Sequence, residues 1–276
     1  MLDTISYVFI FIFGSLVGSF LNVCIHRLPL GESIVWPASH CPKCKRPIPW
    51  YLNIPLISYA MLFGRCRFCK KKISPRYFIV EFITAFAFVA IAGRYGLGFE
   101  SFFYSVLICG LIIATFVDLK HRIIPDEISV GGVVTGFVLR AISGISLRPF
   151  SYDFMPALDS FLGIIVGGGI IFMMGFVFDT IYFKLLKKPP IQGETESMGG
   201  GDVKLLAMIG AFLGWKIALL TFFIAPFFGI IVGLANLMAK KDHTIPYGPF
   251  LSLAAVICMI WANRIIGFVF LTNIYR

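Results

Sequence analysis

The chain has 276 residues, of which 58% are hydrophobic and only 14% are charged, and its formal net charge is +10. A soluble globular protein averages roughly 45–50% apolar and about 25% charged residues, so this composition predicts a membrane protein and not a soluble domain. The basic residues lie in short segments between apolar runs, which argues against nucleic acid as a partner and favours the lipid bilayer.

A helix needs about 20 mostly apolar residues to cross a bilayer. Eight segments approach this pattern, although the fourth is less hydrophobic and the sixth is short: residues 5–25, 77–94, 101–119, 127–147, 156–182, 201–215, 217–239 and 249–272. The sequence therefore predicts an all-α polytopic membrane protein with about eight transmembrane helices.

The distribution of Lys and Arg predicts the orientation of these helices. Most of the 24 basic residues fall in the segments 26–76, 120–126, 183–204 and 240–248, which alternate with the predicted spans so that they share one side. The positive-inside rule places that side in the cytoplasm. Both termini are then expected on the opposite side.

Residues 26–76 form a polar loop with two Cys-x-x-Cys pairs, which gives two predicted regions: residues 1–76, the first span with this loop, and residues 77–276, a membrane bundle. The pairs are Cys41 with Cys44 and Cys66 with Cys69. Two such knuckles at this spacing are typical of a tetrahedral zinc site, in which each tight turn presents two sulfurs. Four thiolates leave no open coordination position, so one structural zinc ion per chain is expected.

Two other uses of these cysteines are open at this point. A pair of disulfides would need an oxidising environment, whereas the predicted orientation places the loop on the reducing cytoplasmic side. A thiol–disulfide redox role is disfavoured because neither Cys-x-x-Cys pair lies next to a βαβ pattern. Zinc binding is therefore the preferred interpretation.

Acidic residues are rare in this chain, and those near membrane depth are candidates for function because burying a charge is costly. Asp118 ends the third predicted span and Asp202 opens the sixth. Both are expected near the cytoplasmic boundary of the bilayer. If the two carboxylates lie within a few ångströms of each other, they cannot both ionise. One then acts as an acid and the other as a base, as in an aspartic-protease dyad.

The alternative is that these aspartates only cap helices. Asp202 suits an N-cap position, whereas Asp118 lies near a helix C-terminus, where a negative charge is unfavourable. The glycines of residues 199–201 would let an extended peptide approach Asp202 closely. Within the fifth span, Gly163, Gly167, Gly168 and Gly169 give a small-xxx-small pattern, which indicates close helix packing.

Several motifs give the sequence a family resemblance. Residues 199–202 match the GxGD signature of intramembrane-type aspartyl proteases, and residues 118–126 resemble the segment that holds the first catalytic aspartate of type IV prepilin peptidases. Further similar segments are spread along most of the chain. They are residues 18–29, the four cysteines, residues 75–77 with Glu81, and residues 245–250. The stretch 183–198 before GxGD looks longer than is usual in the family.

The resemblance implies a bifunctional enzyme of the bacterial inner membrane. It assigns the dyad to Asp118 and Asp202, with Asp126 in support, and implies that the enzyme cleaves the basic leader from prepilins or pseudopilins at the cytoplasmic membrane face. It also implies N-methylation of the new N-terminus with S-adenosylmethionine, which the family associates with the N-terminal region. Asn22, Arg27 and Glu81 are the candidate contacts for that cofactor.

Two classes compete with the protease interpretation. Buried acids and glycine-interrupted helices would also fit a proton-coupled transporter or channel, but the sequence has no inverted repeat and does have a four-cysteine loop. A non-catalytic assembly scaffold, in which zinc only docks partners, is the third class. Loss of leader cleavage on replacing Asp118 or Asp202 separates the protease from both.

Overall fold

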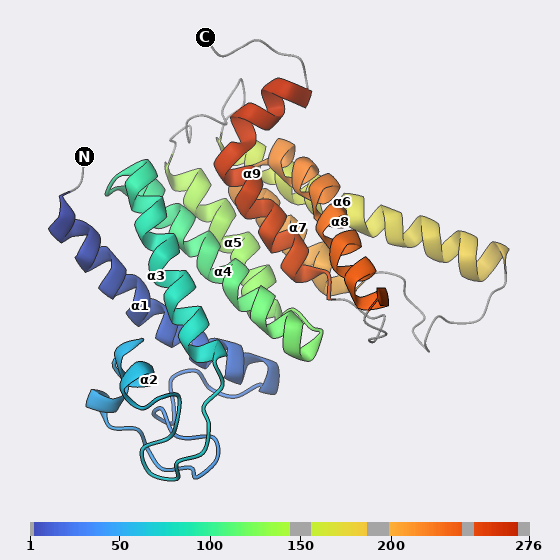
Figure 1. The fold of residues 1–276 in the computed structure, drawn as a ribbon. Coiled ribbons are helices and arrows are strands. Elements are labelled where there is room, and N and C mark those ends of the chain that lie inside the picture. The colour runs from blue at the N-terminus through green and yellow to red at the C-terminus, as the bar shows by residue number, and fades with distance from the viewer. Residues whose placement is uncertain (1–2, 144–155, 187–198, 239–245, 270–276) are drawn as a thin grey trace. The chain divides into compact units, whose positions relative to one another are not determined.

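The computed structural model describes residues 3–143, 156–186, 199–238 and 246–269. Within these ranges the secondary structure is helical, apart from two isolated β-bridges in the cysteine loop. The α-helices, labelled in Figure 1, are α1 Thr4–Arg27, α2 Ile57–Met61, α3 Arg76–Tyr95, α4 Phe99–His121, α5 Asp126–Ser143, α6 Pro156–Asp179, α7 Gly200–Leu213, α8 Trp215–Met238 and α9 Gly248–Val269. The prediction of an all-α fold is confirmed for the described residues.

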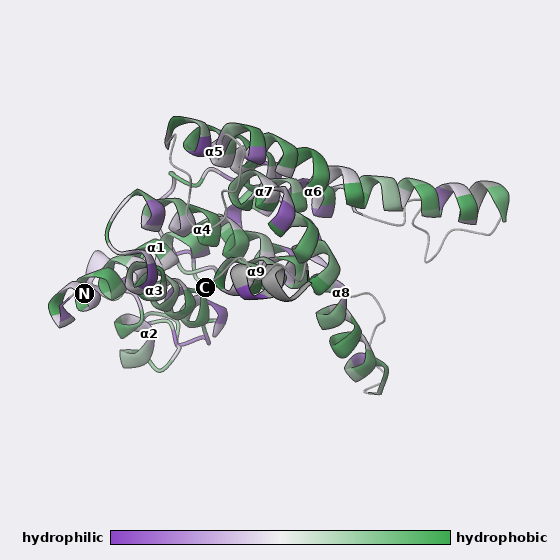
Figure 2. Ribbon diagram, turned by 90° about the horizontal axis from the view of Figure 1, so that it is seen from above, coloured by the Kyte–Doolittle hydropathy of each residue, from purple (hydrophilic) through white to green (hydrophobic). Residues whose placement is uncertain are grey.

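Among the described residues, five helical segments are long and apolar enough to cross a membrane. They are Thr4–Leu30, Arg76–Tyr95, Phe99–His121, Pro156–Tyr182 and Trp215–Met238. Figure 2 shows apolar colouring along most of these helices. Each of the eight predicted segments corresponds to a helix, but α5, α7 and α9 do not meet the criteria for a span over their described residues. With 14 residues, α7 is about 21 Å long, short of the roughly 30 Å hydrocarbon core.

The chain forms two compact units, residues 1–117 and 118–276. The division falls within α4, whose last turn belongs to the second unit. The predicted functional division after residue 76 is a separate hypothesis about which region carries which activity.

In the first unit, α1 and α3 pack side by side with their backbones in close contact (Figure 1). A Cβ atom on Gly14 would lie 2.8 Å from the Ala85 Cα, and one on Gly18 would lie 2.7 Å from the Glu81 Cα. Real Cβ contacts do not approach this closely, so two small residues four positions apart permit this helix pair, as in many membrane helix dimers.

In the second unit, α7 lies at the centre and packs against α5, α6, α8 and α9. Its residues 205–213 are all buried. The closest crossing is with α6, where a Cβ atom on Gly163 would overlap the Gly210 carbonyl and one on Gly167 would overlap that of Leu206. The predicted packing role is confirmed for Gly163 and Gly167, and a Cβ atom on Gly168 would lie 3.3 Å from the Ala207 Cβ, whereas one on Gly169 would meet no described atom within 4 Å.

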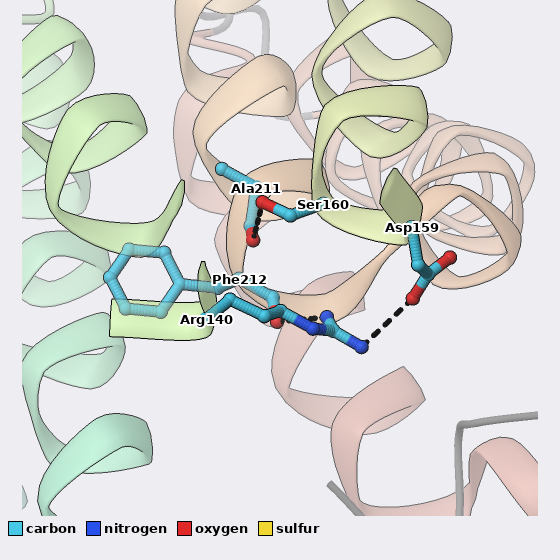
Figure 3. A network of polar contacts seen from close by, with 5 residues as sticks. All are labelled: Arg140, Asp159, Ser160, Ala211 and Phe212. Atoms are coloured by element: carbon cyan, nitrogen blue, oxygen red, sulfur yellow. Dashed lines mark hydrogen bonds and ion pairs between the residues drawn. The ribbon is translucent and has the colours of Figure 1, made fainter. Parts of the chain in front are cut away.

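A polar network closes the C-terminal end of α7 (Figure 3). The Arg140 side chain is 1% exposed and donates hydrogen bonds to the Phe212 carbonyl, at 2.6 Å, and to Asp159 Oδ2, at 2.8 Å. The Ser160 hydroxyl donates to the Ala211 carbonyl at 2.7 Å. The last carbonyls of a helix lack partners within it, so α5 and α6 supply donors to groups that would otherwise be unsatisfied.

Candidate functional site

The second unit brings the Asp118 carboxylate to the start of α9. Asp118 lies in the last turn of α4 and is 6% exposed. Its Oδ2 accepts a 2.9 Å hydrogen bond from the backbone N–H of Gly248, the first residue of α9. The unpaired N–H groups and the dipole at a helix N-terminus favour a carboxylate, so α9 compensates for the unfavourable position of Asp118 at the end of its own helix.

Asp202 lies in the first turn of α7, half-buried, and its charge interacts with that of Asp118. Ile124 lies next to the neighbours of both aspartates. A Cβ atom on Gly201, beside Asp202, would lie 3.2 Å from the Ile124 Cβ, and one on Gly248, which bonds Asp118, would lie 3.3 Å from the Ile124 Cδ1. The structure therefore gathers the two predicted site aspartates at one end of the second unit, although 84 positions separate them in the sequence.

The helix-cap alternative for Asp202 is wrong. The N-cap of α7 is Gly199, and Asp202 is the third residue of the helix, where its own backbone N–H donates to the Gly199 carbonyl at 3.0 Å. No side chain caps this helix. Asp202 still benefits from the positive end of the helix dipole, but capping does not explain its position.

Tyr247 completes the surroundings of the two carboxylates. Burial, together with the charge of nearby Asp202, raises the pKa of Tyr247 to about 12. Tyr247 and Gly248 are thus consecutive residues next to different aspartates. In the sequence this segment stands out only by its family resemblance, and helix periodicity gives no signal for a backbone donor that acts 130 positions away.

Asp126 and Lys204 form an ion pair of 2.6 Å near this end of the unit. Asp126 begins α5 and Lys204 lies two residues after Asp202. Both side chains are exposed, so the pair contributes little to stability. Lys204 was not predicted as a site residue.

The four cysteines of the loop come together as predicted. The sulfur atoms all lie within 4.8 Å of one another in the group Cys41, Cys44, Cys66 and Cys69. The Cys41 and Cys69 sulfurs are 4.0 Å apart. Zinc–sulfur bonds of about 2.3 Å in a tetrahedron place sulfurs about 3.8 Å apart, so the thiols fit a zinc ion with a small contraction.

The two Cys-x-x-Cys segments have the same backbone design. The amide of Cys41 donates to the Arg46 carbonyl and that of Cys66 to the Lys71 carbonyl, while Lys45 and Lys70 each have a φ of 58°. Hydrogen bonds from the backbone N–H groups of Cys69 and Phe68 lower the pKa of Cys66 to about 7. All seven cysteines are free thiols, so the disulfide alternative has no support.

A second candidate site is a cavity of about 600 Å³ in the first unit, lined by α1, α3 and the loop between them. Its volume lies within the range of small-molecule sites, roughly 300–1,000 Å³. Asn22, Arg27 and Glu81, the three predicted cofactor contacts, all line this cavity, and each is at least 92% buried. Cys41 and Cys66 line it as well, so the cysteine cluster forms part of its wall.

Each of the three residues bonds the backbone of a different segment. Asn22 Nδ2 donates to the Tyr77 carbonyl at 3.0 Å. Arg27 donates to the carbonyls of Ser33 and Pro37 at 2.9 and 2.6 Å. Glu81 Oε2 accepts from the Leu56 amide at 2.8 Å. One buried atom, Asn22 Oδ1, has no partner, which in a protein interior costs about 1–3 kcal/mol.

Leu56 has a strained backbone, and Glu81 bonds to it. Its φ of 61° and ψ of −51°, with a 2.6 Å hydrogen bond from the Ile57 amide to the Pro55 carbonyl, describe a classic γ-turn, which is rare for a residue with a branched side chain. Such strain persists only where surrounding contacts hold it and is concentrated at functional sites. Neighbouring residues Leu52, Asn53 and Ile54 line the cavity.

Comparison with protein families gives two matches. Residues 12–95 match the bacterial peptidase A24 N-terminal domain, and residues 105–234 match the type IV leader peptidase family. The cavity and the cysteines lie in the first match, and Asp118 and Asp202 lie in the second. No solved structure matches the chain.

Curated relatives carry the name prepilin leader peptidase/N-methyltransferase. A protein of Myxococcus xanthus is 37% identical over 84% of this chain, and the match spans 63% of that relative's length. Proteins of Aeromonas salmonicida and Pseudomonas aeruginosa are 30% and 32% identical, over 93% and 91% of this chain and 91% and 89% of their own lengths. The similarity thus covers both sites.

Proposed function

The chain is an enzyme of the type IV leader peptidase family, and we propose that it removes the leader peptide from type IV prepilins or pseudopilins and then methylates the new N-terminal amine. The observation that carries the peptidase half is the meeting of Asp118 and Asp202 at one end of the second unit. The methyltransferase half rests on the relatives' shared name and on the cavity in the first unit.

In the proposed peptidase reaction, the two carboxylates divide the roles of base and acid. The Gly248 N–H that donates to Asp118 favours its charged form, so Asp118 takes a proton from the attacking water. Asp202 protonates the carbonyl oxygen of the scissile bond as the new C–O bond forms. As the C–N bond breaks, protonated Asp118 gives its proton to the leaving amine, and Asp202 takes a proton from a hydroxyl group of the intermediate as the carbonyl re-forms, so no covalent enzyme intermediate is required.

The proposed methyl transfer uses the cavity beside α1 and α3. S-adenosylmethionine, when bound, supplies the methyl group. The cavity fits a ligand of this kind because it has the volume and one unsatisfied acceptor, and Asn22, Arg27 and Glu81 would surround the ligand. A zinc ion held by the four cysteines would cross-link the loop that forms the cavity wall, a structural role.

We propose that the chain sits in a bacterial inner membrane with eight helices in or across the bilayer and with both sites on the cytoplasmic side. The basic loops support this orientation, because the cysteine loop and the segments beside Asp118 and Asp202 carry most of the lysines and arginines. A prepilin would then keep its basic leader in the cytoplasm and its apolar helix in lipid, which presents the scissile bond at the membrane boundary.

Replacing each aspartate by asparagine tests the peptidase proposal. Asp118→Asn and Asp202→Asn remove one ionisable group each with almost no change in volume, so each variant should insert into membranes but lose leader cleavage, as measured by the mass of a prepilin substrate. Glu127→Gln is a matched control, because Glu127 is an exposed acid close to Asp118 in the sequence. Cleavage that survives either aspartate substitution would remove that residue from the dyad.

A further inference from the structure

The cavity of the first unit presents one face of α1 to its contents. Ser19, Asn22, Val23, His26 and Arg27 line it, at the three- and four-residue spacing of a single helix face. The opposite wall comes from α3 and from the loop. The chemistry of a ligand can therefore be inferred from the polar atoms that this face and its opposite wall leave without partners.

Two of the charged side chains in the wall are engaged by the protein itself. Arg27 holds the loop through the carbonyls of Ser33 and Pro37. Glu81 holds the strained Leu56 and also contacts the Ser19 hydroxyl. Their hydrogen bonds maintain the shape of the cavity, which makes Arg27 and Glu81 positioning residues.

Asn22 differs from both because half of its amide group is unused. Its Nδ2 faces two carbonyl oxygens, those of Tyr77 at 3.0 Å and Gly18 at 3.4 Å. Carbonyl oxygens only accept hydrogen bonds, so the amide nitrogen must lie on this side and Oδ1 on the other. The Oδ1 atom is buried without a partner, and it is the one such side-chain atom among the described residues that line the cavity.

We propose that Asn22 Oδ1 is the recognition point of this cavity for an amino group carried on an apolar or aromatic body. An unsatisfied acceptor is complementary to an N–H donor. The aromatic side chains of Trp36, Tyr59 and Tyr77 in the wall suit the remainder of such a ligand.

This inference rests on the proposed methyltransferase function, which offers two sources of the amino group. S-adenosylmethionine has an adenine amino group and an α-ammonium group. The cleaved substrate has an N-terminal ammonium group, beside a phenyl ring if its first residue is phenylalanine. The shared chemistry is an N–H donor, and separate ligands distinguish the sources.

Binding to the full-length protein in detergent tests the inference. Isothermal titration would compare S-adenosylhomocysteine and a short peptide that begins with phenylalanine, for wild type and Asn22→Leu. Removal of the acceptor should weaken at least one of these ligands by about tenfold. Thr84→Val is the matched control, because Thr84 is fully buried on α3, one turn from Glu81, and does not line the cavity. The Thr84→Val protein should bind each ligand within about twofold of the wild-type affinity.

Modified ligands give a second test that requires no substitution. The wild-type protein would be titrated with three modified ligands. These are the peptide with an acetylated N-terminus, S-adenosylhomocysteine with a carbonyl in place of the adenine amino group, and S-adenosylhomocysteine without its α-amino group. The inference requires about a tenfold loss for the one amino group that reaches Asn22. This test decides the question if Asn22→Leu does not fold.

The outcomes separate the inference from the function beneath it. If a parent ligand binds the wild type, but Asn22→Leu binds as tightly as wild type or every modified ligand binds as tightly as its parent, Asn22 does not recognise an amino group. If neither parent ligand binds the wild type, the proposed use of this cavity in methyl transfer fails first, and the inference fails with it.

Discussion

A single methyl group added at Gly248 should strongly impair peptide cleavage. In Gly248→Ala, the new Cβ would lie 2.7 Å from Asp118 Oδ2 and 3.3 Å from the Ile124 Cδ1. An ordinary contact needs about 3.4 Å or more, so the carboxylate must move by about 0.7 Å. A misplacement of about 1 Å at a reacting group can reduce a rate by about 100-fold, so we expect kcat for leader cleavage to fall 10- to 100-fold.

The assay is leader cleavage of a prepilin at a series of substrate concentrations, which separates kcat from KM. The backbone N–H remains in Gly248→Ala, so the effect should come from displacement of the carboxylate and should leave KM within about threefold of wild type. Gly131→Ala on α5 is the control, because a Cβ there meets no atom within 4 Å. It should cleave normally and gain up to about 1 kcal/mol of helix stability.

A wild-type kcat for Gly248→Ala would refute this reasoning. It would mean either that Asp118 has free space that the structure does not show or that the carboxylate is not at the reacting bond. The Asp118→Asn variant distinguishes these explanations, since only the first retains a dependence on Asp118.

Three further predictions concern the stability and metal content of the protein. Asp159→Ala should lower the free energy of unfolding by about 3 kcal/mol, because it leaves the buried Arg140 charge without its carboxylate, and a double variant with Arg140→Leu should recover part of that loss in thermal unfolding. Gly18→Ala should lower the unfolding temperature by forcing α1 away from the α3 backbone, at a cost of about 1–3 kcal/mol, and an unchanged value would contradict the close approach. Purified protein should contain about one zinc ion per chain by elemental analysis, and Cys66→Ser should lose it; equal metal in both would contradict an all-thiolate site.

The sequence predicted those parts of the fold that depend on local pattern. Apolar runs of helical length identified every long helix, and the paired cysteines identified a cluster whose two halves are built alike. The spacing of Gly163 and Gly167 predicted a close helix crossing, and the structure identifies α7 as the partner helix. In each case the signal is local, since the hydrophobicity, turn or small-residue spacing that determines the feature is contained within a short stretch of chain.

The sequence did not reveal contacts that depend on how distant helices meet. The hydrogen bond from Gly248 to Asp118 and the pairing of Arg140 with Asp159 join different helices, and no periodicity specifies their partners. Arg140 lies within the fourth predicted span and is 1% exposed, and no pattern in the sequence indicates a partner for its charge. A buried arginine becomes tolerable only when an acceptor and a carboxylate meet it, and that depends on tertiary structure.

The short length of α7 determines where its aspartate lies. Gly163 of α6 crosses Gly210 of α7, and a Cβ on Gly168 would lie 3.7 Å from the Val203 carbonyl oxygen, so the two helices run antiparallel and Asp202 lies level with the middle of α6. The second half of α6 extends beyond the N-terminal end of α7. Several apolar side chains of α6, from Phe172 onward, are exposed. A longer α7 would carry its first turn to the end of α6. The network at the opposite end of α7 fixes that helix along its axis, which sets the depth of Asp202 beside α6.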